Sequence, residues 1–117
     1  MFHITKEFHF SASHQLTHLA DDHQCARLHG HNYIVTVELA APALNNDGFV
    51  RDYHELKPLK DYIDNSFDHR HLNDILDGHS TAENMAYHFY EWCAARWPET
   101  AAVTVSETPK TTATYRP

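Results

Sequence analysis

The stretch that decides the fold of this chain is His29-Gly30-His31-Asn32-Tyr33-Ile34-Val35-Thr36-Val37-Glu38-Leu39. Apolar side chains recur there at every second position from Tyr33 to Leu39, which is the pattern of a strand with one buried face. The two histidines that open the stretch are also two residues apart, so they lie on one face of an extended chain. The sequence therefore predicts a strand over residues 31–41 with a pair of imidazoles at its start.

A similar alternation in residues 2–10 predicts another half-buried strand. Its apolar face carries Phe2, Ile4, Phe8 and Phe10. Residues 15–28, between the two strands, are polar and irregular and predict a loop. After the second strand, Asn45-Asn46-Asp47-Gly48 predicts a turn, and Phe49-Val50 a short extended piece.

Two helices are predicted in the second half of the chain. In the first, Asp52 is the N-cap, Pro58 introduces a bend near the start, and the apolar residues are spaced three and four apart. These apolar residues are Leu56, Leu59, Ile63 and Phe67.

The second helix begins at Ser80-Thr81-Ala82-Glu83, which matches a capping box, and ends near Pro98. Its apolar positions are Met85, Phe89, Trp92 and Cys93. Two short strands follow, residues 102–106 and 111–115, on either side of the turn Thr108-Pro109-Lys110. The predicted order is β-β-α-α-β-β, an α+β sheet with both helices on one face.

Length and composition limit the classes of protein that this chain can be. Its 117 residues are enough for one domain, residues 1–117, with a modest core. The formal charge of −7, without a cluster of lysine or arginine, disfavours nucleic acid as a partner. No apolar run approaches the ~20 residues that cross a bilayer, so no membrane partner is expected. Two cysteines without an evident signal peptide favour reduced thiols and a cytoplasmic location.

Histidine is strongly over-represented, with twelve in the chain. Six have no recognisable spacing and are expected to be surface or hydrogen-bonded core residues: His3, His9, His18, His54, His79 and His88. In contrast, His14 ends the first predicted strand and His29 and His31 open the second, so adjacent antiparallel strands would bring them together. Three nitrogen ligands with an open fourth position are typical of a catalytic Zn²⁺ site rather than a structural one.

Cys25 lies in the polar loop shortly before His29 and has two functional interpretations. A nearby metal and Arg27 would favour its reactive thiolate form. Alternatively, Cys25 is a fourth zinc ligand, which would close the site and leave no reactive position. A buried structural role is harder to support in a polar loop, whereas it fits Cys93 in the middle of the second predicted helix.

Two further segments place carboxylates where the chain turns. In Phe67-Asp68-His69-Arg70-His71-Leu72-Asn73, the aspartate can orient the neighbouring imidazole for acid–base chemistry, although such pairs also occur as simple caps. In Ser106-Glu107-Thr108-Pro109, the carboxylate can accept two parallel N–H bonds from the edge of a pterin or guanine. The alternative for Glu107 is a solvated side chain at a turn.

Together these segments resemble the 6-pyruvoyltetrahydropterin synthase / 6-carboxytetrahydropterin synthase family over nearly the whole chain. Several motifs occur in the family's order, which makes the resemblance far more specific than any one of them. They are Phe10-Ser11-Ala12-Ser13-His14, Cys25 to Tyr33, Asp52-Tyr53-His54-Glu55-Leu56-Lys57, Asp68 to Asn73, Thr81-Ala82-Glu83-Asn84 and Val105-Ser106-Glu107-Thr108-Pro109.

The resemblance implies the T-fold (tunnelling fold), in which the elements form a four-stranded antiparallel sheet. It also implies a homo-oligomer, a trimer or a hexamer, whose sheets close a barrel without free edges and whose active sites lie between subunits. The implied site residues are the zinc ligands His14, His29 and His31, the catalytic residues Cys25, Asp68 and His69, and the pterin anchor Glu107.

The implied substrate is 7,8-dihydroneopterin triphosphate. Zinc would act as a Lewis acid on the substrate side chain, while Cys25 and His69 move protons on opposite sides of it. The short gap between Cys25 and His29 is that of the carboxy-pterin synthases, whereas the pyruvoyl enzymes have a longer one. The resemblance therefore favours a 6-carboxy-5,6,7,8-tetrahydropterin synthase, which releases triphosphate and acetaldehyde in queuosine or other 7-deazapurine biosynthesis, over a 6-pyruvoyltetrahydropterin synthase.

The chain also departs from the family. Gly78-His79-Ser80-Thr81 replaces the usual Asn-Pro-Thr before the second helix, and His71 adds an imidazole that could replace His69 in the relay. The cations that a triphosphate needs are scattered, at Arg27, Arg51, Lys110 and Arg116. Two other classes of function stay open: a non-catalytic, histidine-rich metal-binding protein, and a T-fold aldolase or epimerase that acts on dihydroneopterin without a three-histidine site.

Overall fold

Two long antiparallel strands carry the alternating sequences further than predicted. β1 spans Phe2–His14 and β2 spans His29–Ala41 in the computed structural model, which describes residues 1–117. They pair without a break from Phe2 opposite Ala41 to His14 opposite His29. β1 thus continues past residue 10 and β2 begins before residue 31, because the alternation of buried and more exposed side chains continues to the ends of both strands.

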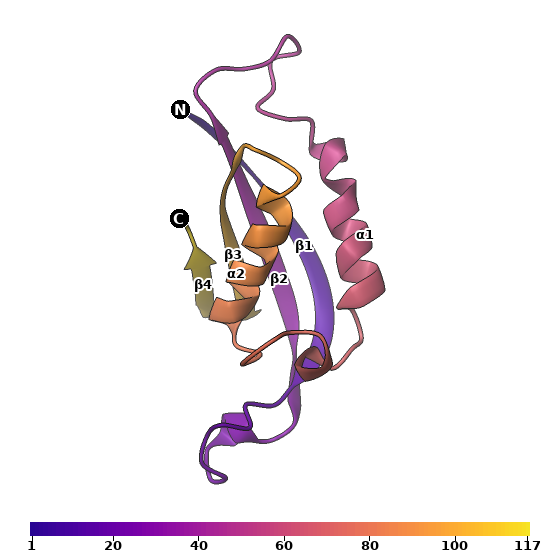
Figure 1. Cartoon of the computed structure of the whole chain (residues 1–117), viewed down its shortest axis with the longest axis vertical. Helices are drawn as coiled ribbons and strands as arrows, with labels where there is room; N and C mark the ends of the chain where they lie inside the picture. The colour runs from indigo at the N-terminus through magenta and orange to yellow at the C-terminus, as the bar shows by residue number, and fades with distance from the viewer.

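Two further strands complete the sheet. β3 (Thr100–Thr108) pairs antiparallel with β2, and β4 (Thr111–Tyr115) pairs antiparallel with β3. The strand order is therefore β1-β2-β3-β4, with β1 and β4 at the edges (Figure 1). The turn predicted around Pro109 separates the last two strands. β3 is longer than the predicted strand over residues 102–106, whereas β4 has the predicted bounds.

Both helices, α1 (Lys57–Ser66) and α2 (Ala82–Ala94), pack on one face of the sheet (Figure 1). A single cluster of 22 buried residues fills the space between the layers. In it, Phe10 of β1 makes edge contacts with the rings of Phe67 and Phe89, which come from the helical layer. Phe2, predicted on the buried face, is 48% exposed at the end of β1. The α+β class and the arrangement of both helices on one face are confirmed.

The start of the first helix differs from the prediction. Asp52 caps a 3₁₀ helix at Tyr53–Leu56, where its side chain accepts the N–H of His54, and α1 begins only after this turn. Pro58 falls in the first turn of α1, where a backbone N–H has no acceptor within the helix, so the predicted bend is not needed. The predicted extended piece at residues 49–50 is also absent, because the N–H of Phe49 closes the preceding turn.

The N-terminus of α2 corrects a second prediction. Thr81 is the N-cap, and its Oγ1 accepts the N–H of Asn84 at 3.2 Å. The predicted capping box is wrong because Ser80 is buried beneath the end of β1, where its backbone oxygen accepts a hydrogen bond from His14. The loop before α2 therefore reaches the residues that end β1.

Candidate metal centre and active site

Three histidines meet where β1 ends and β2 begins. His14 is the last residue of β1 and lies directly opposite His29, and His31 follows on the same face of β2. Their ligand nitrogens all lie within 4.8 Å of one another, and the Nε2 atoms of His14 and His29 are 2.9 Å apart. We call these three residues the histidine cluster.

Backbone carbonyls orient two of the three imidazoles. His14 Nδ1 donates to the backbone oxygen of Ser80 at 2.7 Å, and His29 Nδ1 donates to that of Arg27 at 2.7 Å. A carbonyl oxygen only accepts, so each Nδ1 carries a proton, and in the neutral form of each ring Nε2 is the nitrogen whose lone pair is available to a metal. Sequence reasoning missed Ser80, because a contact made by a backbone oxygen leaves no signal in the residue type.

The donor set fits a divalent metal such as zinc. Tetrahedral Zn–N bonds of about 2.0–2.1 Å place neighbouring nitrogens about 3.3 Å apart, close to the 2.9 Å between His14 and His29. His31 Nε2 is buried and makes no hydrogen bond in the chain, although the Glu107 carboxylate lies 3.1 Å away, and a metal ion would give this nitrogen a partner. Burial lowers the pKa of His14 and of His31 from the ordinary value of 6.5, so both are neutral ligands at neutral pH.

Glu107 lies at the edge of the histidine cluster. Its Oε2 is 3.1 Å from His31 Nε2 and 3.9 Å from His14 Nε2. The side chain is 25% exposed and lines an open groove of about 790 Å³. Glu107 can therefore present its carboxylate to a molecule bound beside the cluster.

Tyr33 lies in the core beside these residues. The β2–β3 register pairs Ile34 with Ser106, so the next residues, Tyr33 and Glu107, face each other on the cluster's side of the sheet. Burial, with the negative charge of Glu107 as a smaller cause, raises the pKa of Tyr33. Sequence analysis assigned Tyr33 only to the buried face, although its spacing of two from His31 was a signal that it shares the cluster's face.

Asp68 and His69 lie on the connection between α1 and α2, along the outer edge of β1. Asp68 Oδ1 accepts the N–H of Ser11 at 3.0 Å and lies 3.0 Å from His69 Nδ1. The Ser11 hydrogen bond, followed by the one from His69, lowers the pKa of Asp68 below its usual value. His69 is the only non-glycine residue with a positive φ, at 58°, a strained conformation that is frequent at functional sites.

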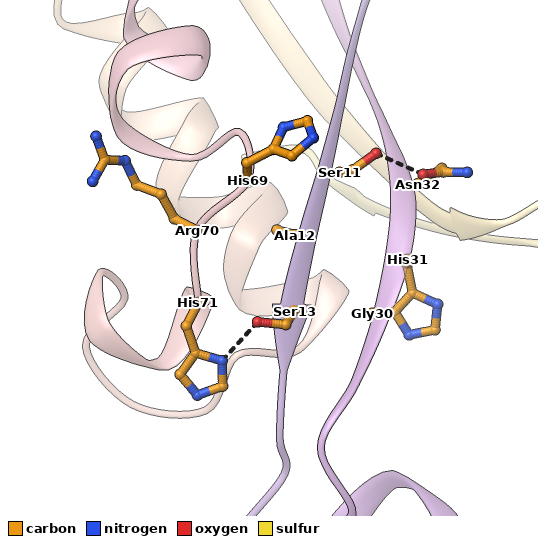
Figure 2. Close-up of a pocket in the computed structure, with 9 residues that line it drawn as sticks. All are labelled: Ser11, Ala12, Ser13, Gly30, His31, Asn32, His69, Arg70 and His71. Atoms are coloured by element: carbon orange, nitrogen blue, oxygen red, sulfur yellow. Dashed lines mark hydrogen bonds between the residues drawn. The ribbon is translucent and has the colours of Figure 1, made fainter.

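His71 does not compete with His69 for Asp68. Its Nδ1 is 2.9 Å from Ser13 Oγ, and the two residues form a short β-bridge (Figure 2). Within the chain, the imidazole that pairs with Asp68 is therefore that of His69.

The aspartate–histidine pair and the histidine cluster are not joined within the chain. In Figure 2, His69 and His31 lie on opposite sides of the β1–β2 pair. Both residues line an open cavity of about 530 Å³, but no hydrogen bond or ion pair links Asp68 or His69 to the cluster. The imidazole of His69 is 81% exposed at the sheet edge.

Cys25 lies in a one-turn 3₁₀ helix, Gln24–Ala26, within the loop that joins β1 to β2. The side chain of His23 accepts its N–H at 3.0 Å, and its backbone oxygen accepts the N–H of Leu16 at 3.0 Å. The thiol is free and half-buried. Its sulfur does not belong to the group of ligand atoms formed by the histidine cluster, so Cys25 is not a fourth ligand in this arrangement.

The fold and the site define a class of protein: a T-fold sheet with three histidines arranged to bind a metal at the start of its second strand. Residues 3–117 match the family model of 6-pyruvoyl tetrahydropterin synthase, and the chain belongs to that family. Similar proteins of known name are tetrahydropterin synthases, which are lyases, and the chain is an enzyme of the same type.

Known relatives cover almost the whole chain. The 6-carboxy-5,6,7,8-tetrahydropterin synthase of Synechocystis is 38% identical over 98% of this chain and 93% of its own length. That of Bacillus subtilis is 31% identical over 99% of this chain and 86% of its own length. The solved 6-pyruvoyl tetrahydropterin synthase of Caenorhabditis elegans superposes with a TM-score of 0.86 at 29% identity, covering 99% of this chain and 95% of that chain. The T-fold and the family resemblance are confirmed.

Proposed function

We propose that this enzyme is a zinc-dependent 6-carboxy-5,6,7,8-tetrahydropterin synthase that converts 7,8-dihydroneopterin triphosphate to 6-carboxytetrahydropterin, triphosphate and acetaldehyde. The observation that carries the proposal is the histidine cluster with Glu107 at its edge. The names of two similar relatives support the carboxy-pterin product, as does the short gap between Cys25 and His29. The product would supply queuosine or another 7-deazapurine.

The histidine cluster would hold Zn²⁺, which when bound polarises the hydroxyl oxygens of the substrate side chain and acidifies the adjacent C–H bonds. The chain's own contribution is to favour the neutral form of two of the imidazoles and to orient two of them. Burial favours the neutral forms of His14 and His31, and the carbonyl acceptors at Ser80 and Arg27 fix the rings of His14 and His29.

Glu107 would bind and orient the pterin. Its carboxylate can accept two parallel N–H bonds from the 2-amino-4-oxo edge of the ring, a bidentate contact that fixes the plane of the ligand. Because Glu107 Oε2 is 3.1 Å from His31 Nε2, a pterin held by this carboxylate would bind next to the histidine cluster. Binding and orientation of the substrate would thus come from the strand that neighbours the metal ligands.

Cys25 and His69 would move the protons. Asp68 is ionised at neutral pH, as an ordinary aspartate is, and its lowered pKa reinforces this, so it can accept from His69 Nδ1 and leave Nε2 to exchange a proton with the substrate. The sulfur of Cys25 would exchange a proton on the other side of the substrate side chain.

We also propose that the enzyme is a trimer or a hexamer with active sites between subunits. The sheet ends in two edge strands, β1 and β4, and pairing β1 of one copy with β4 of the next would close a barrel without edges. Such an assembly can bring the exposed His69 of one chain to the histidine cluster of another.

The two free thiols support a reducing location, which we propose is the cytoplasm. Neither α1 nor α2 has the length and apolar character needed to span a bilayer.

The product formed from 7,8-dihydroneopterin triphosphate tests the proposed reaction. We expect 6-carboxytetrahydropterin by mass spectrometry and an equal amount of acetaldehyde in a coupled alcohol dehydrogenase assay. Formation of 6-pyruvoyltetrahydropterin without acetaldehyde would assign the alternative synthase reaction. Several loosely bound metals per chain, with no turnover of either kind, would instead favour the non-catalytic metal-binding protein.

A further inference from the structure

The hydroxyl of Tyr33 is a buried polar group with no hydrogen-bond partner in the chain. The residue is only 1% exposed. Burying an unpaired hydroxyl lowers stability, whereas a phenylalanine of the same shape would carry no such penalty. The hydroxyl therefore points to a partner that it acquires when the active site is in its working state.

Ring contacts hold this hydroxyl beside the histidine cluster. The ring of Tyr33 stacks on Phe10, with centroids 5.0 Å apart. It also makes edge contacts with the imidazoles of His31 and His14, at centroid distances of 5.5 and 6.1 Å. The position of the Tyr33 ring is therefore set by Phe10 of the core and by two imidazoles of the histidine cluster.

Glu107 is the acceptor that the fold places opposite Tyr33. Tyr33 precedes Ile34 on β2 and Glu107 follows Ser106 on β3, so the two residues lie one position beyond the Ile34–Ser106 pair on the same face, where opposite Cβ atoms are about 4.5–5.5 Å apart. Both residues line the same groove. In the structure the carboxylate of Glu107 lies against His31 instead, 3.1 Å from Nε2.

The contact with His31 and a contact with Tyr33 are alternatives for the carboxylate. His31 Nε2 is also the atom that faces the proposed metal position, and a nitrogen that gives its lone pair to a metal has no proton there to share with Glu107. The buried, unpaired donor that the same register brings toward the carboxylate is the Tyr33 hydroxyl.

We propose that Tyr33 is a positioning residue: its hydroxyl donates a hydrogen bond to the Glu107 carboxylate and holds it where it receives the N–H edge of the pterin. This inference rests on the proposed function, in which Glu107 binds the pterin. It also explains a buried hydroxyl for which the rest of the chain offers no acceptor.

Tyr33→Phe and Tyr62→Phe form a matched pair that tests the inference in the zinc-loaded enzyme. The Tyr62 hydroxyl has a partner, His88 Nε2 at 2.7 Å, and lies on α1, outside the proposed site. We expect Tyr33→Phe to raise the dissociation constant for 7,8-dihydroneopterin about tenfold or more, as a hydrogen bond to a charged group predicts, with an unchanged or higher unfolding midpoint. Tyr62→Phe should lower the midpoint and leave the dissociation constant unchanged.

A double-mutant cycle with Glu107→Ala separates positioning from direct contact. If Tyr33 acts through Glu107, adding Tyr33→Phe to Glu107→Ala should change pterin binding little. An equal loss of affinity in both backgrounds would mean that Tyr33 contacts the pterin itself and would overturn the positioning role. Wild-type binding with no change in Tyr33→Phe would overturn this inference alone, whereas failure of the wild-type enzyme to bind the pterin would overturn the proposed function as well.

Discussion

The histidine cluster and the proposed proton-relay residues are positioned in different ways. His14 and His29 lie on two paired strands, and the register of those strands alone places one opposite the other. Cys25 and His69 lie in connections, one in a single 3₁₀ turn and the other in a left-handed turn at the edge of β1. The sheet thus assembles the histidine cluster within one chain, whereas the proposed relay groups lie in connections where Cys25 is half-buried and His69 is exposed.

This difference separates two properties of the enzyme. Metal binding should depend on the sheet of a single chain, because all three nitrogens come from it. Turnover should depend in addition on the proposed relay residues, which an adjacent subunit would bring to the cluster in the proposed oligomer. Substitutions in the two regions should therefore give different combinations of metal content and activity.

The largest effect is expected for His29→Ala, which should abolish both zinc binding and turnover. Two remaining nitrogens do not complete the three-ligand set of a catalytic zinc site. Zinc content by elemental analysis and product formation by chromatography measure the two losses. His54→Ala is the matched control, because its side chain is 97% exposed and should affect neither property. Retention of a full equivalent of zinc by His29→Ala would contradict the assignment.

Cys25→Ala should lower turnover by about 10²–10⁴-fold, the usual contribution of a proton-transferring group, and leave the zinc content unchanged. The reason is that the thiol does not belong to the ligand group of the histidine cluster. Loss of zinc together with activity would show instead that Cys25 is a ligand.

Acidification should weaken the metal-free fold through the buried imidazoles. Burial holds the pKa of His14 and His31 below 6.5 in the folded chain, so the unfolded chain binds more protons once the pH falls below that value. Their contribution to stability is complete above about pH 6.5 and is lost as the pH falls through the lowered folded-state pKa values. Urea unfolding at a series of pH values should show this decline, and a rise in stability over the same range would contradict it.

The smallest effect concerns the backbone of His69. Alanine and glycine both remove the imidazole, but only glycine adopts a φ of 58° without strain. His69→Gly should therefore unfold with a free energy about 1 kcal/mol higher than His69→Ala, while both lose the relay. Equal free energies in urea unfolding would show that the left-handed turn is not strained.

The difference between residues on paired strands and residues in connections also determines how much of the site the sequence could predict. A period of two places the residues of β1 and β2 on their faces and, once the strands pair, brings His14, His29 and His31 together. The environment of Ser80 could not be predicted, because its backbone oxygen bonds a residue that is distant in sequence. That long-range contact also explains why a local capping pattern gave the wrong N-cap.

The connections were predictable only as motifs. Asp68 and His69 are adjacent in sequence, so their pairing followed from the residues. Their place along the outer edge of β1 depends on hydrogen bonds to Ser11, which no local pattern indicates.

Activity of mixed oligomers tests most directly whether a neighbouring subunit completes the metal centre. His29→Ala chains keep the relay pair, and His69→Ala chains keep the metal ligands, so each variant alone should be inactive. When the two are dissociated and reassembled in equal amounts, about a quarter of the sites should combine an intact cluster with an intact His69 from the next chain, and activity should return accordingly. No recovery at any mixing ratio would mean that both groups of residues must come from one chain.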